Sequence, residues 1–207
     1  MEKIKYKEFL DWKNDLRRSD TLLDVGCWDG KNTEKFAKLC NAYGVEIDRD
    51  KMKEINPGIR KKIKWGDVTK NIPFKMKFDY AYMGEVLEHV NDDEKAIKNI
   101  ASILKKGGRF VFTTPNSIPF FNYWDPAWIR WKLGLGNVHR HYSVKKLEKT
   151  LSGYGLKIEK YAIGWGLSFI LYRWINILSK HVFHSKKVFG TEQGDGYFDL
   201  CVIAKKM

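Results

Sequence analysis

The stretch Thr21-Leu22-Leu23-Asp24-Val25-Gly26-Cys27-Trp28-Asp29-Gly30 constrains the fold of this chain more than any other segment. An apolar run with one aspartate leads into a Gly-x-x-x-Gly turn, and a helical pattern follows directly. This pattern is typical of a buried parallel strand that enters a tight loop and then a helix, with the loop backbone exposed to a ligand. A dinucleotide-binding loop has Gly-x-Gly-x-x-Gly, but Trp28 and Lys31 occupy its second and third glycine positions here. The turn therefore favours a ligand that carries a nucleoside without phosphates.

At this turn the chain resembles the class I S-adenosylmethionine-dependent methyltransferases, whose first motif is Asp-x-Gly-x-Gly-x-Gly. Asp24, Gly26 and Gly30 match the motif, and Trp28 replaces the middle glycine. The resemblance implies that the cofactor is S-adenosyl-L-methionine and the product S-adenosyl-L-homocysteine. It also implies a cofactor loop made of Asp24, Gly26, Cys27, Trp28 and Gly30. The indole at position 28 restricts the backbone and adds bulk near the cofactor.

A second strand is predicted over residues 41–48, and Glu46 falls at its expected end. Ligands of doubly wound sheets gather at the carboxyl ends of the strands, where a carboxylate can accept both hydroxyls of a ribose. The family resemblance assigns the ribose to Glu46 and contact with the adenine face to Ile47. Asp48 is a rival for the ribose; its alternative role is the N-cap of a helix that contains residues 51–55.

Two further strand ends carry residues that the resemblance makes significant. A strand around residues 61–65 ends in Gly66-Asp67-Val68, and the family resemblance implies that Asp67 and the backbone of Val68 recognise the adenine. A strand over residues 78–83 leads into Gly84-Glu85-Val86-Leu87-Glu88-His89-Val90, which closely resembles the Glu-Val-Leu-Glu-His-Val string of the ubiquinone-biosynthesis-like branch. We expect Gly84 to lie beside the cofactor.

The rest of the pattern predicts a single α/β methyltransferase domain over residues 1–207. An amphipathic helix is expected over residues 3–18, and a helix with several isoleucines on one face closes at Lys105-Lys106-Gly107-Gly108. Further strands are expected over residues 109–114, 156–163 and 197–204. The fold implied is a doubly wound, Rossmann-like, seven-stranded mixed sheet with an antiparallel last strand. Helical, lid-like inserts are expected at about 116–142 and 164–190.

Both inserts are rich in apolar side chains. Trp124, Trp128 and Trp131 recur at i, i+4 and i+7, which predicts three indoles on one helical face. Ser143 is expected to cap a helix that ends near residue 153. Residues 162–178 are apolar except for three positions, a stretch too short to span a bilayer. Such a stretch can lie flat on a bilayer, cover an apolar substrate, or pack against the domain or a partner subunit. A flexible polar loop is expected over residues 190–196.

The candidate catalytic residues are Glu85, His89, His139 and His141. A positioned general base is needed where the methyl acceptor must lose a proton, and it typically adds about 10²–10⁴-fold in rate. Glu85 follows the strand where the acceptor is expected, and the two later histidines can project into the same pocket. A histidine beside a helix cap can instead serve only as a hydrogen-bonding prop. No group of residues has the spacing of metal ligands.

Charge and the termini suggest partners and location. The 38 lysines and arginines exceed the 25 acidic residues, and a net charge of +13 attracts nucleic acid, anionic membranes or acidic small molecules. Solvated lysine-rich helices explain the same charge. Three cysteines without metal spacing predict buried thiols in a reducing cytoplasm. The first residues hold no apolar signal region, so we expect a cytoplasmic protein with optional peripheral membrane contact.

These observations predict an S-adenosylmethionine-dependent methyltransferase acting on a small or lipid-like acceptor, as a monomer or homodimer. An oxygen acceptor is the first expectation, and carbon or nitrogen the second. An RNA methyltransferase is one alternative, since the chain is basic and rich in aromatic residues. A non-catalytic, cofactor-fold binding module at a membrane surface is another, motivated by Trp28. An NAD(P)-dependent dehydrogenase is disfavoured by Trp28 and Lys31.

Overall fold

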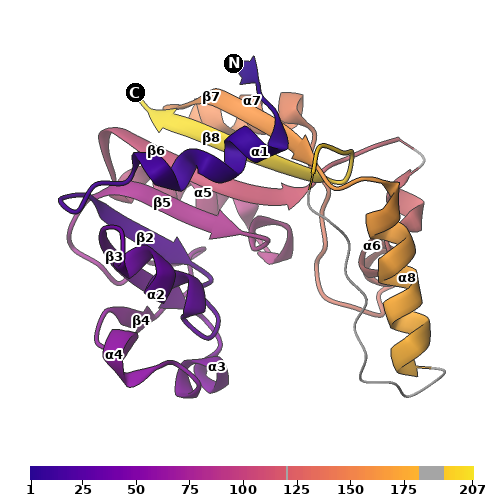
Figure 1. Ribbon diagram of the computed structural model, residues 1–207, viewed down its shortest axis with the longest axis horizontal. Helices are drawn as coiled ribbons and strands as arrows, with labels where there is room; N and C mark the ends of the chain where they lie inside the picture. The colour runs from indigo at the N-terminus through magenta and orange to yellow at the C-terminus, as the bar shows by residue number, and fades with distance from the viewer. Residues whose placement is uncertain (120, 182–193) are drawn as a thin grey trace.

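The computed structural model describes residues 1–119, 121–181 and 194–207, which form a mixed sheet covered by helices on both faces (Figure 1). The strands of the sheet are β1 (Glu2–Lys3), β2 (Thr21–Val25), β3 (Asn41–Glu46), β4 (Ile63–Trp65), β5 (Phe78–Gly84), β6 (Leu104–Pro115), β7 (Leu156–Gly164) and β8 (Asp199–Lys206). Buried, largely apolar strands such as Thr21–Val25 and Phe78–Gly84 are what a sheet covered on both faces requires.

The strand order is β1-β7-β8-β6-β5-β2-β3-β4. The pairs from β6 through β5, β2 and β3 to β4 are parallel, whereas β8 runs antiparallel to both β6 and β7. The predicted doubly wound sheet with an antiparallel last strand is therefore confirmed. The sheet has one strand more than expected, because Glu2 and Lys3 add a parallel edge to β7. Two exposed residues show no alternation by which a sequence pattern could reveal them.

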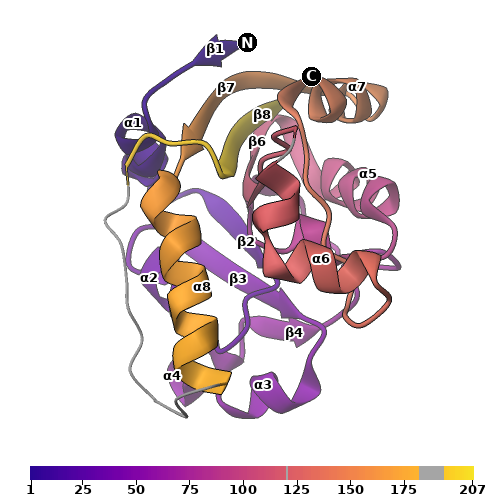
Figure 2. The same ribbon diagram turned by 90° about the vertical axis from the view of Figure 1, so that its right-hand side faces the viewer.

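Helices and short 3-10 turns connect the strands. The helical segments are α1 (Tyr6–Leu10), η1 (Asp11–Asp15), α2 (Lys31–Ala37), α3 (Arg49–Lys53), α4 (Pro57–Arg60), η2 (Leu87–His89), α5 (Asp93–Ile103), η3 (Phe121–Trp124), α6 (Pro126–Lys132), α7 (Val144–Gly153) and α8 (Leu167–His181). One apolar cluster joins the sheet to α5 and α7, and a second joins its opposite face to α1, η1 and α2. Figure 2 shows these two groups of helices on opposite sides of the sheet.

Two predicted helix boundaries were wrong. The single helix expected over residues 3–18 is the short helix α1 followed by the 3-10 segment η1, which ends where Leu16 turns extended. The helix expected to close at residues 105–108 ends earlier, at Ile103, because the next residue is already extended. Lys105 then donates to both carboxylate oxygens of Asp79, at 3.0 and 2.8 Å. The Lys-Lys-Gly-Gly segment therefore belongs to β6, and not to a helix end.

The helices α6 and α8 lie beyond the edge of the sheet toward which β2, β5 and β6 point (Figure 1). The prediction of three indoles on one helix was wrong, since Trp124 lies in η3 while Trp128 and Trp131 lie in α6. The indole N–H of Trp174 donates to the carbonyl oxygen of Trp124 at 2.9 Å, which ties α8 to η3. Among the described residues, no helix combines the length and apolar character needed to cross a bilayer. Part of the predicted 190–196 loop lies outside the described residues.

Candidate active site

The turn after β2 is held by its own backbone and needs its two glycines. The N–H groups of Gly26 and Cys27 donate to the carbonyl oxygen of Val45 at 2.8 and 3.2 Å, which joins the turn to β3. Gly26 and Gly30 have φ values of 71° and 78°, the left-handed region that favours glycine. A Cβ atom on Gly26 would lie 2.5 Å from Cγ2 of Val86, so the segment just after β5 packs directly against this backbone.

Trp28, which stands where the family has a glycine, also adopts the left-handed region, with φ of 51°. This conformation costs a non-glycine residue about 1–3 kcal/mol and persists only where the surroundings impose it. The indole is 55% exposed, and the Lys51 ammonium lies 4.8 Å from its centroid. The tryptophan is therefore directed to the surface of the turn. By contrast, the thiol of Cys27 is buried, and burial raises its pKa to about 12.

Asp24 lies beneath the turn as a buried carboxyl group. Its Oδ2 accepts a hydrogen bond of 2.6 Å from the hydroxyl of Thr33, the third residue of α2. Burial raises the pKa of Asp24 to about 7, and the nearby charge of Glu46 adds to the rise, while the Thr33 hydroxyl opposes it. The pair links the strand to the helix that follows the turn. Asp24 therefore supports the loop from below.

Glu46, the last residue of β3, is buried and accepts three backbone hydrogen bonds. Its Oε2 accepts from the N–H of Trp28 at 2.7 Å, and its Oε1 accepts from the N–H groups of Ile47 and Asp48, each at 2.8 Å. A carboxylate offers about four acceptor positions, two on each oxygen. Oε1 is filled by these bonds, so Oε2 has one position left for a ligand hydroxyl. The same carboxylate also clamps the Trp28 turn to the end of β3.

The residues after Glu46 form an accessible shelf. Ile47 is 58% exposed, and its carbonyl oxygen accepts from the indole N–H of Trp65 at 2.9 Å. The Arg49 guanidinium stacks over the Trp65 ring at 4.2 Å. Asp48 caps α3, with its Oδ1 accepting from the N–H groups of residues 50 and 51, so its alternative role as an N-cap is confirmed. An exposed aliphatic side chain beside Glu46 is suited to the flat face of a base.

Asp67 and Val68 follow β4 on the same edge of the sheet. Oδ1 of Asp67 accepts from both the N–H and the hydroxyl of Thr69, at 2.9 and 2.7 Å. Burial alone would raise the pKa of this carboxyl, but the bonds from Thr69 and the Lys70 ammonium, 3.6 Å from Oδ2, outweigh it. The pKa of Asp67 is therefore lowered. The carbonyl oxygen of Val68 accepts from the Asn99 amide at 2.7 Å. Asp67 is thus an ionised acceptor in a self-stabilised turn.

The end of β5 brings two glutamates together. Glu85 adopts φ of 55°, an uncommon conformation for a non-glycine residue, and follows Gly84 directly. Glu88 is buried, and burial raises its pKa well above its ordinary value, with the nearby charge of Glu85 adding to the rise. Its Oε1 lies 3.7 Å from Nε2 of His89, whose side chain is 51% exposed. A buried carboxyl group whose ionisation is disfavoured therefore lies near Glu85 and a solvent-accessible imidazole.

A cavity of about 360 Å³ reaches this strand end. Aromatic side chains form much of its wall, and polar side chains come from η1, from α2, from the ends of β5 and β6 and from the start of β8. The lining residues are Tyr6, Phe9, Leu10, Trp12, Lys13, Asn32, Lys35, Phe36, Leu39, Tyr82, Glu85, Thr113, Trp165 and Asp199. Burial raises the pKa of both the Tyr6 and the Tyr82 phenols, and the charge of Glu85 contributes to each rise. The cavity therefore combines aromatic walls with charged side chains, and Glu85 is one of the acidic groups on its wall.

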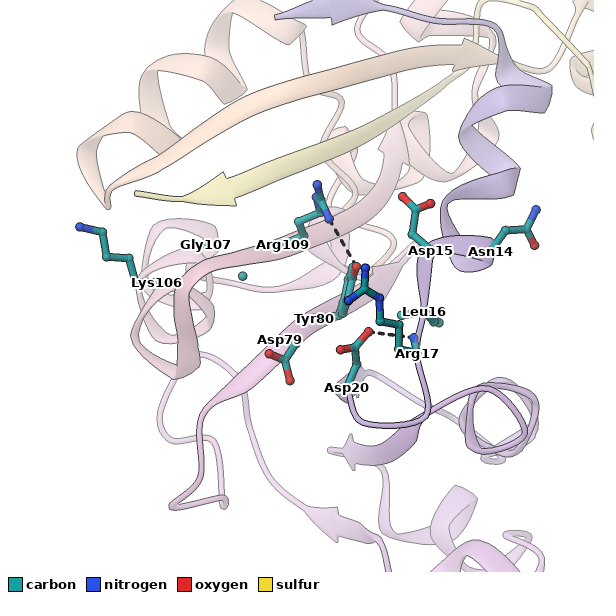
Figure 3. Close-up of a pocket in the computed structure, with 11 residues that line it drawn as sticks. Asn14, Asp15, Leu16, Arg17, Asp20, Asp79, Tyr80, Lys106, Gly107 and Arg109 are labelled. Atoms are coloured by element: carbon teal, nitrogen blue, oxygen red, sulfur yellow. Dashed lines mark hydrogen bonds between the residues drawn. The ribbon is translucent and has the colours of Figure 1, made fainter.

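A second, wider crevice of about 700 Å³ lies at the opposite edge of the sheet. Figure 3 shows Asp20, Asp79, Tyr80 and Arg109 around it, with the Arg109 guanidinium donating to the Tyr80 hydroxyl at 3.4 Å. Asp20 precedes β2 and Asp79 lies at the start of β5, so these are the amino ends of the strands. Ligands of doubly wound sheets bind at the carboxyl ends. The smaller cavity beside Glu85 is therefore the candidate active site.

His139 and His141 gather around Asp125, the N-cap of α6. Nε2 of each imidazole lies 2.9 Å from Oδ2 of that carboxylate. The predicted N-cap Ser143 follows, and its hydroxyl accepts from the N–H of Lys146 at 3.3 Å, which confirms the expected start of α7. The segment that carries the two histidines also contacts the segment after β5. Nδ1 of His89 lies 3.0 Å from the carbonyl oxygen of Val138, the residue before His139.

Several residues of the site were missed by sequence reasoning. Glu88 lies within the Glu-Val-Leu-Glu-His-Val string, where its three-residue spacing from Glu85 is the only signal. Tyr6 comes from a helix whose role at the site no local pattern indicates, because its contact with the strand ends spans most of the chain. Asp125 reads as a plain N-cap before a proline, and its histidine partners follow 14 and 16 residues later.

Comparisons with known proteins bear on the family and the fold of the chain. A family model described as a methyltransferase domain matches residues 4–161. A ubiquinone biosynthesis O-methyltransferase from Coxiella burnetii is 33% identical over 101 residues, which cover 46% of this chain and 43% of that protein. The chain spans less than half the length of the curated relatives it matches.

Solved structures show the same fold at low identity. An S-adenosylmethionine-dependent methyltransferase from Mesorhizobium loti superposes with a TM-score of 0.68 at 17% identity, covering 97% of each chain. Magnesium protoporphyrin IX methyltransferase from Synechocystis PCC 6803, solved with bound S-adenosyl-L-homocysteine, superposes with a TM-score of 0.62 at 14% identity. That match covers 97% of this chain and 80% of the Synechocystis protein.

Proposed function

Because the chain belongs to the methyltransferase domain family, we propose that it transfers a methyl group from S-adenosyl-L-methionine to a small or lipid-like acceptor. We further propose that the acceptor atom is oxygen, with carbon or nitrogen as alternatives. One observation carries the proposal: the Gly26–Gly30 turn, the Glu46 carboxylate and the cavity beside Glu85 share the carboxyl edge of the sheet. This is the edge at which doubly wound sheets bind nucleosides.

The residues at this edge fit the adenosyl part of the cofactor. We assign one ribose hydroxyl to Oε2 of Glu46, which has an acceptor position beyond its bond to Trp28. The exposed side chain of Ile47 would lie against the adenine, and Asp67 with the backbone of Val68 would recognise its edge. Asp24, Gly26, Cys27 and Gly30 would shape the loop, and Gly84 would leave room beside the sulfonium. When bound, the cofactor supplies an electrophilic methyl group.

The cavity beside Glu85 suits a flat, largely apolar acceptor. Tyr6, Phe9, Phe36 and Tyr82 supply aromatic walls, and Glu85 supplies an acidic group that can accept a hydrogen bond from a hydroxyl. Methyl transfer is an in-line displacement, so holding the acceptor oxygen in line accounts for much of the rate. Well-oriented reactions gain about 7–11 kcal/mol in this way. A hydroxylated aromatic ring is the acceptor that best matches these walls.

The proton of the acceptor hydroxyl needs a route to solvent. We propose that Glu85 accepts it as the methyl–oxygen bond forms. Burial and the charge of Glu85 raise the pKa of Glu88, which favours its protonated form, and its Oε1 lies 3.7 Å from Nε2 of His89. We propose that Glu88 takes up the proton from Glu85 and that the exposed imidazole of His89 carries it to solvent. His139 and His141 face Asp125, which makes positioning of the neighbouring segment their better-supported role.

A lipid-like acceptor is supported by the helices beyond the strand ends. Large apolar side chains of η3 and α8 are exposed in the described structure, namely Tyr123, Trp124, Leu171 and Leu178. We propose that α6 and α8 form the lid over the acceptor, and that the same surface gives peripheral contact with a lipid bilayer. The matched relatives are O-methyltransferases, which supports oxygen as the acceptor atom.

The test is transfer of a radiolabelled methyl group from S-adenosyl-L-methionine to a panel of acceptors. The panel holds catechols with and without an isoprenoid tail, a secondary amine, and an RNA transcript. We expect labelling of a hydroxylated ring, with a loss of about 10²–10⁴-fold in Glu85→Gln. The matched control is Glu148→Gln, an exposed residue of α7, which should retain the wild-type rate. Labelling of RNA alone, or equal rates in both variants, would contradict the proposal.

A further inference from the structure

Three side chains that the proposed methyl transfer does not use converge beside the end of β5. Nε2 of His139 and Nε2 of His141 each lie 2.9 Å from Oδ2 of Asp125. Each of the three residues offers one possible ligand atom, and these ligand atoms lie within 4.8 Å of one another. Asp125 and His139 are buried, and the side chain of His141 is only 6% exposed. Two imidazole nitrogens and a carboxylate oxygen are a donor set used for transition-metal ions.

The hydrogen bonds around His141 leave its Nε2 without a proton in the neutral ring. The backbone N–H of Ile118 donates to Oδ1 of Asn122 at 3.2 Å, which fixes that atom as an oxygen. The same oxygen lies 2.8 Å from Nδ1 of His141, so Nδ1 must carry the hydrogen and donate it. Nε2 of the neutral ring is then a lone pair facing the Asp125 carboxylate. Two acceptors at 2.9 Å repel each other unless a cation lies between them.

His139 supplies the second imidazole of the group. Its Nε2 is directed at the same oxygen that His141 faces. Each ring contacts another aromatic ring. Trp128 stacks on His141 with ring centroids 6.1 Å apart, and the ring centroids of His89 and His139 are 5.0 Å apart.

We propose that Asp125, His139 and His141 bind a divalent transition-metal ion of the zinc type, through Oδ2 and the two Nε2 atoms. Zinc–ligand distances of about 2.0–2.2 Å in tetrahedral geometry separate neighbouring ligand atoms by about 3.3 Å. The 2.9 Å separations therefore need to open by only a few tenths of an ångström. The two imidazoles disfavour calcium and magnesium, which prefer oxygen ligands. His141 also has the outer partner that metal-binding imidazoles usually keep, in Asn122.

The ion would join two segments at the strand ends. Asp125 begins α6, whereas the histidines precede α7, and the N–H of Arg140 donates to the carbonyl oxygen of Glu88 at 3.1 Å. Metal binding would therefore hold α6 against the Glu88 end of β5. This property goes beyond methyl transfer, since it can be measured without cofactor or acceptor.

The test is titration of the chelator-treated, full-length protein with Zn²⁺ by calorimetry, together with Co²⁺ absorption spectroscopy. We expect one equivalent to bind to the wild type, with the intense visible bands of tetrahedral cobalt and a raised melting temperature. His141→Gln and Asp125→Asn should weaken binding at least about tenfold. The matched control is Asp92→Asn, which lies outside the three-residue cluster and should bind as the wild type does.

Two results would overturn the inference. The first is a folded wild type that binds neither ion, in which case a proton on His141 is the cation between the two groups. The second is equal binding by the cluster variants and their controls. The wild-type titration alone decides the matter if a cluster variant fails to fold. Binding of S-adenosyl-L-homocysteine is measured in parallel, so a failed metal site is distinguished from a failed cofactor site.

Discussion

Replacement of Asp24 by asparagine should stabilise the fold, and increasingly so as the pH rises. The carboxyl is buried, its ordinary pKa of 3.8 is raised to about 7, and it accepts one short bond from Thr33. An asparagine oxygen can accept the same bond and never ionises. Because the folded-state pKa is raised, the native protein binds more protons than the unfolded chain between about pH 4 and pH 7. Stability from this group is therefore complete below that window and is lost as the pH rises through it.

The magnitude follows from the two pKa values. One pKa unit is about 1.36 kcal/mol, so the raised pKa of Asp24 lowers the free energy of unfolding of the wild type by about 2.3 kcal/mol at about pH 5.5 and by about 4.3 kcal/mol at about pH 8.5. The free energy of unfolding of Asp24→Asn should thus gain about 2 kcal/mol on that of the wild type across this interval. Relaxation of the loop makes this an upper value.

The assay is urea unfolding of both proteins at the two pH values, followed by circular dichroism. The control is Asp92→Asn, since Asp92 is an exposed N-cap whose pKa is lowered, first of all by its bond from the Lys95 N–H. This variant should follow the wild type across the interval. Parallel pH profiles for Asp24→Asn and the wild type would refute the reasoning, because they would mean that Asp24 is already ionised at little cost in the fold.

Two other perturbations test the packing of the strand ends. Gly26→Ala should lose about 2–5 kcal/mol of unfolding free energy in urea melts, because of the left-handed backbone and the overlap with Val86. Adding Val86→Ala to the same chain should restore the part of the loss that comes from the overlap. Strictly additive losses in the double variant would contradict the contact. Glu88→Gln should gain stability on the wild type as the pH rises above the ordinary range of a glutamate, by up to about 1.36 kcal/mol per pH unit, because burial and Glu85 raise the pKa of Glu88 so that its ionisation opposes folding. The same melts measure it, and a difference that does not change with pH would mean that Glu88 ionises as easily in the fold as in the unfolded chain.

Much of the sheet was predictable because its signals are local. The Thr21–Val25 strand, the turn after it and the Ser143 cap follow from apolar runs, glycines and a hydroxyl at fixed positions, and each was confirmed. The extra edge strand was not predictable, since its two residues are exposed and pair only with β7, far away in the sequence. The helix end at Ile103 was misread because Lys105 binds Asp79, a tertiary contact that overrides the basic and glycine-rich signal.

In the candidate site, the sequence likewise indicates single residues, whereas their partners are known only from the structure. Glu46 and Glu85 lie at strand ends, where spacing from the first motif indicates them, but their partners are set by the fold. Glu46 accepts hydrogen bonds from three backbone N–H groups because the Trp28 turn lies against the end of β3. A sequence pattern does not show this contact. His139 and His141 were expected beside the acceptor as bases. Their convergence on Asp125 arises from a loop closing on a helix cap, so the metal-ligand geometry appears only in three dimensions.

The most direct test of the central claim is calorimetric titration of the protein with S-adenosyl-L-homocysteine. The account predicts one binding site in the wild type and at least about tenfold weaker binding in Glu46→Gln, since a hydrogen bond to a charged acceptor contributes about 1.5–3 kcal/mol. Glu148→Gln is the control, and thermal melts without ligand establish that each variant is folded. No heat of binding at millimolar ligand with a folded wild type, or equal affinity in Glu46→Gln, would contradict the account.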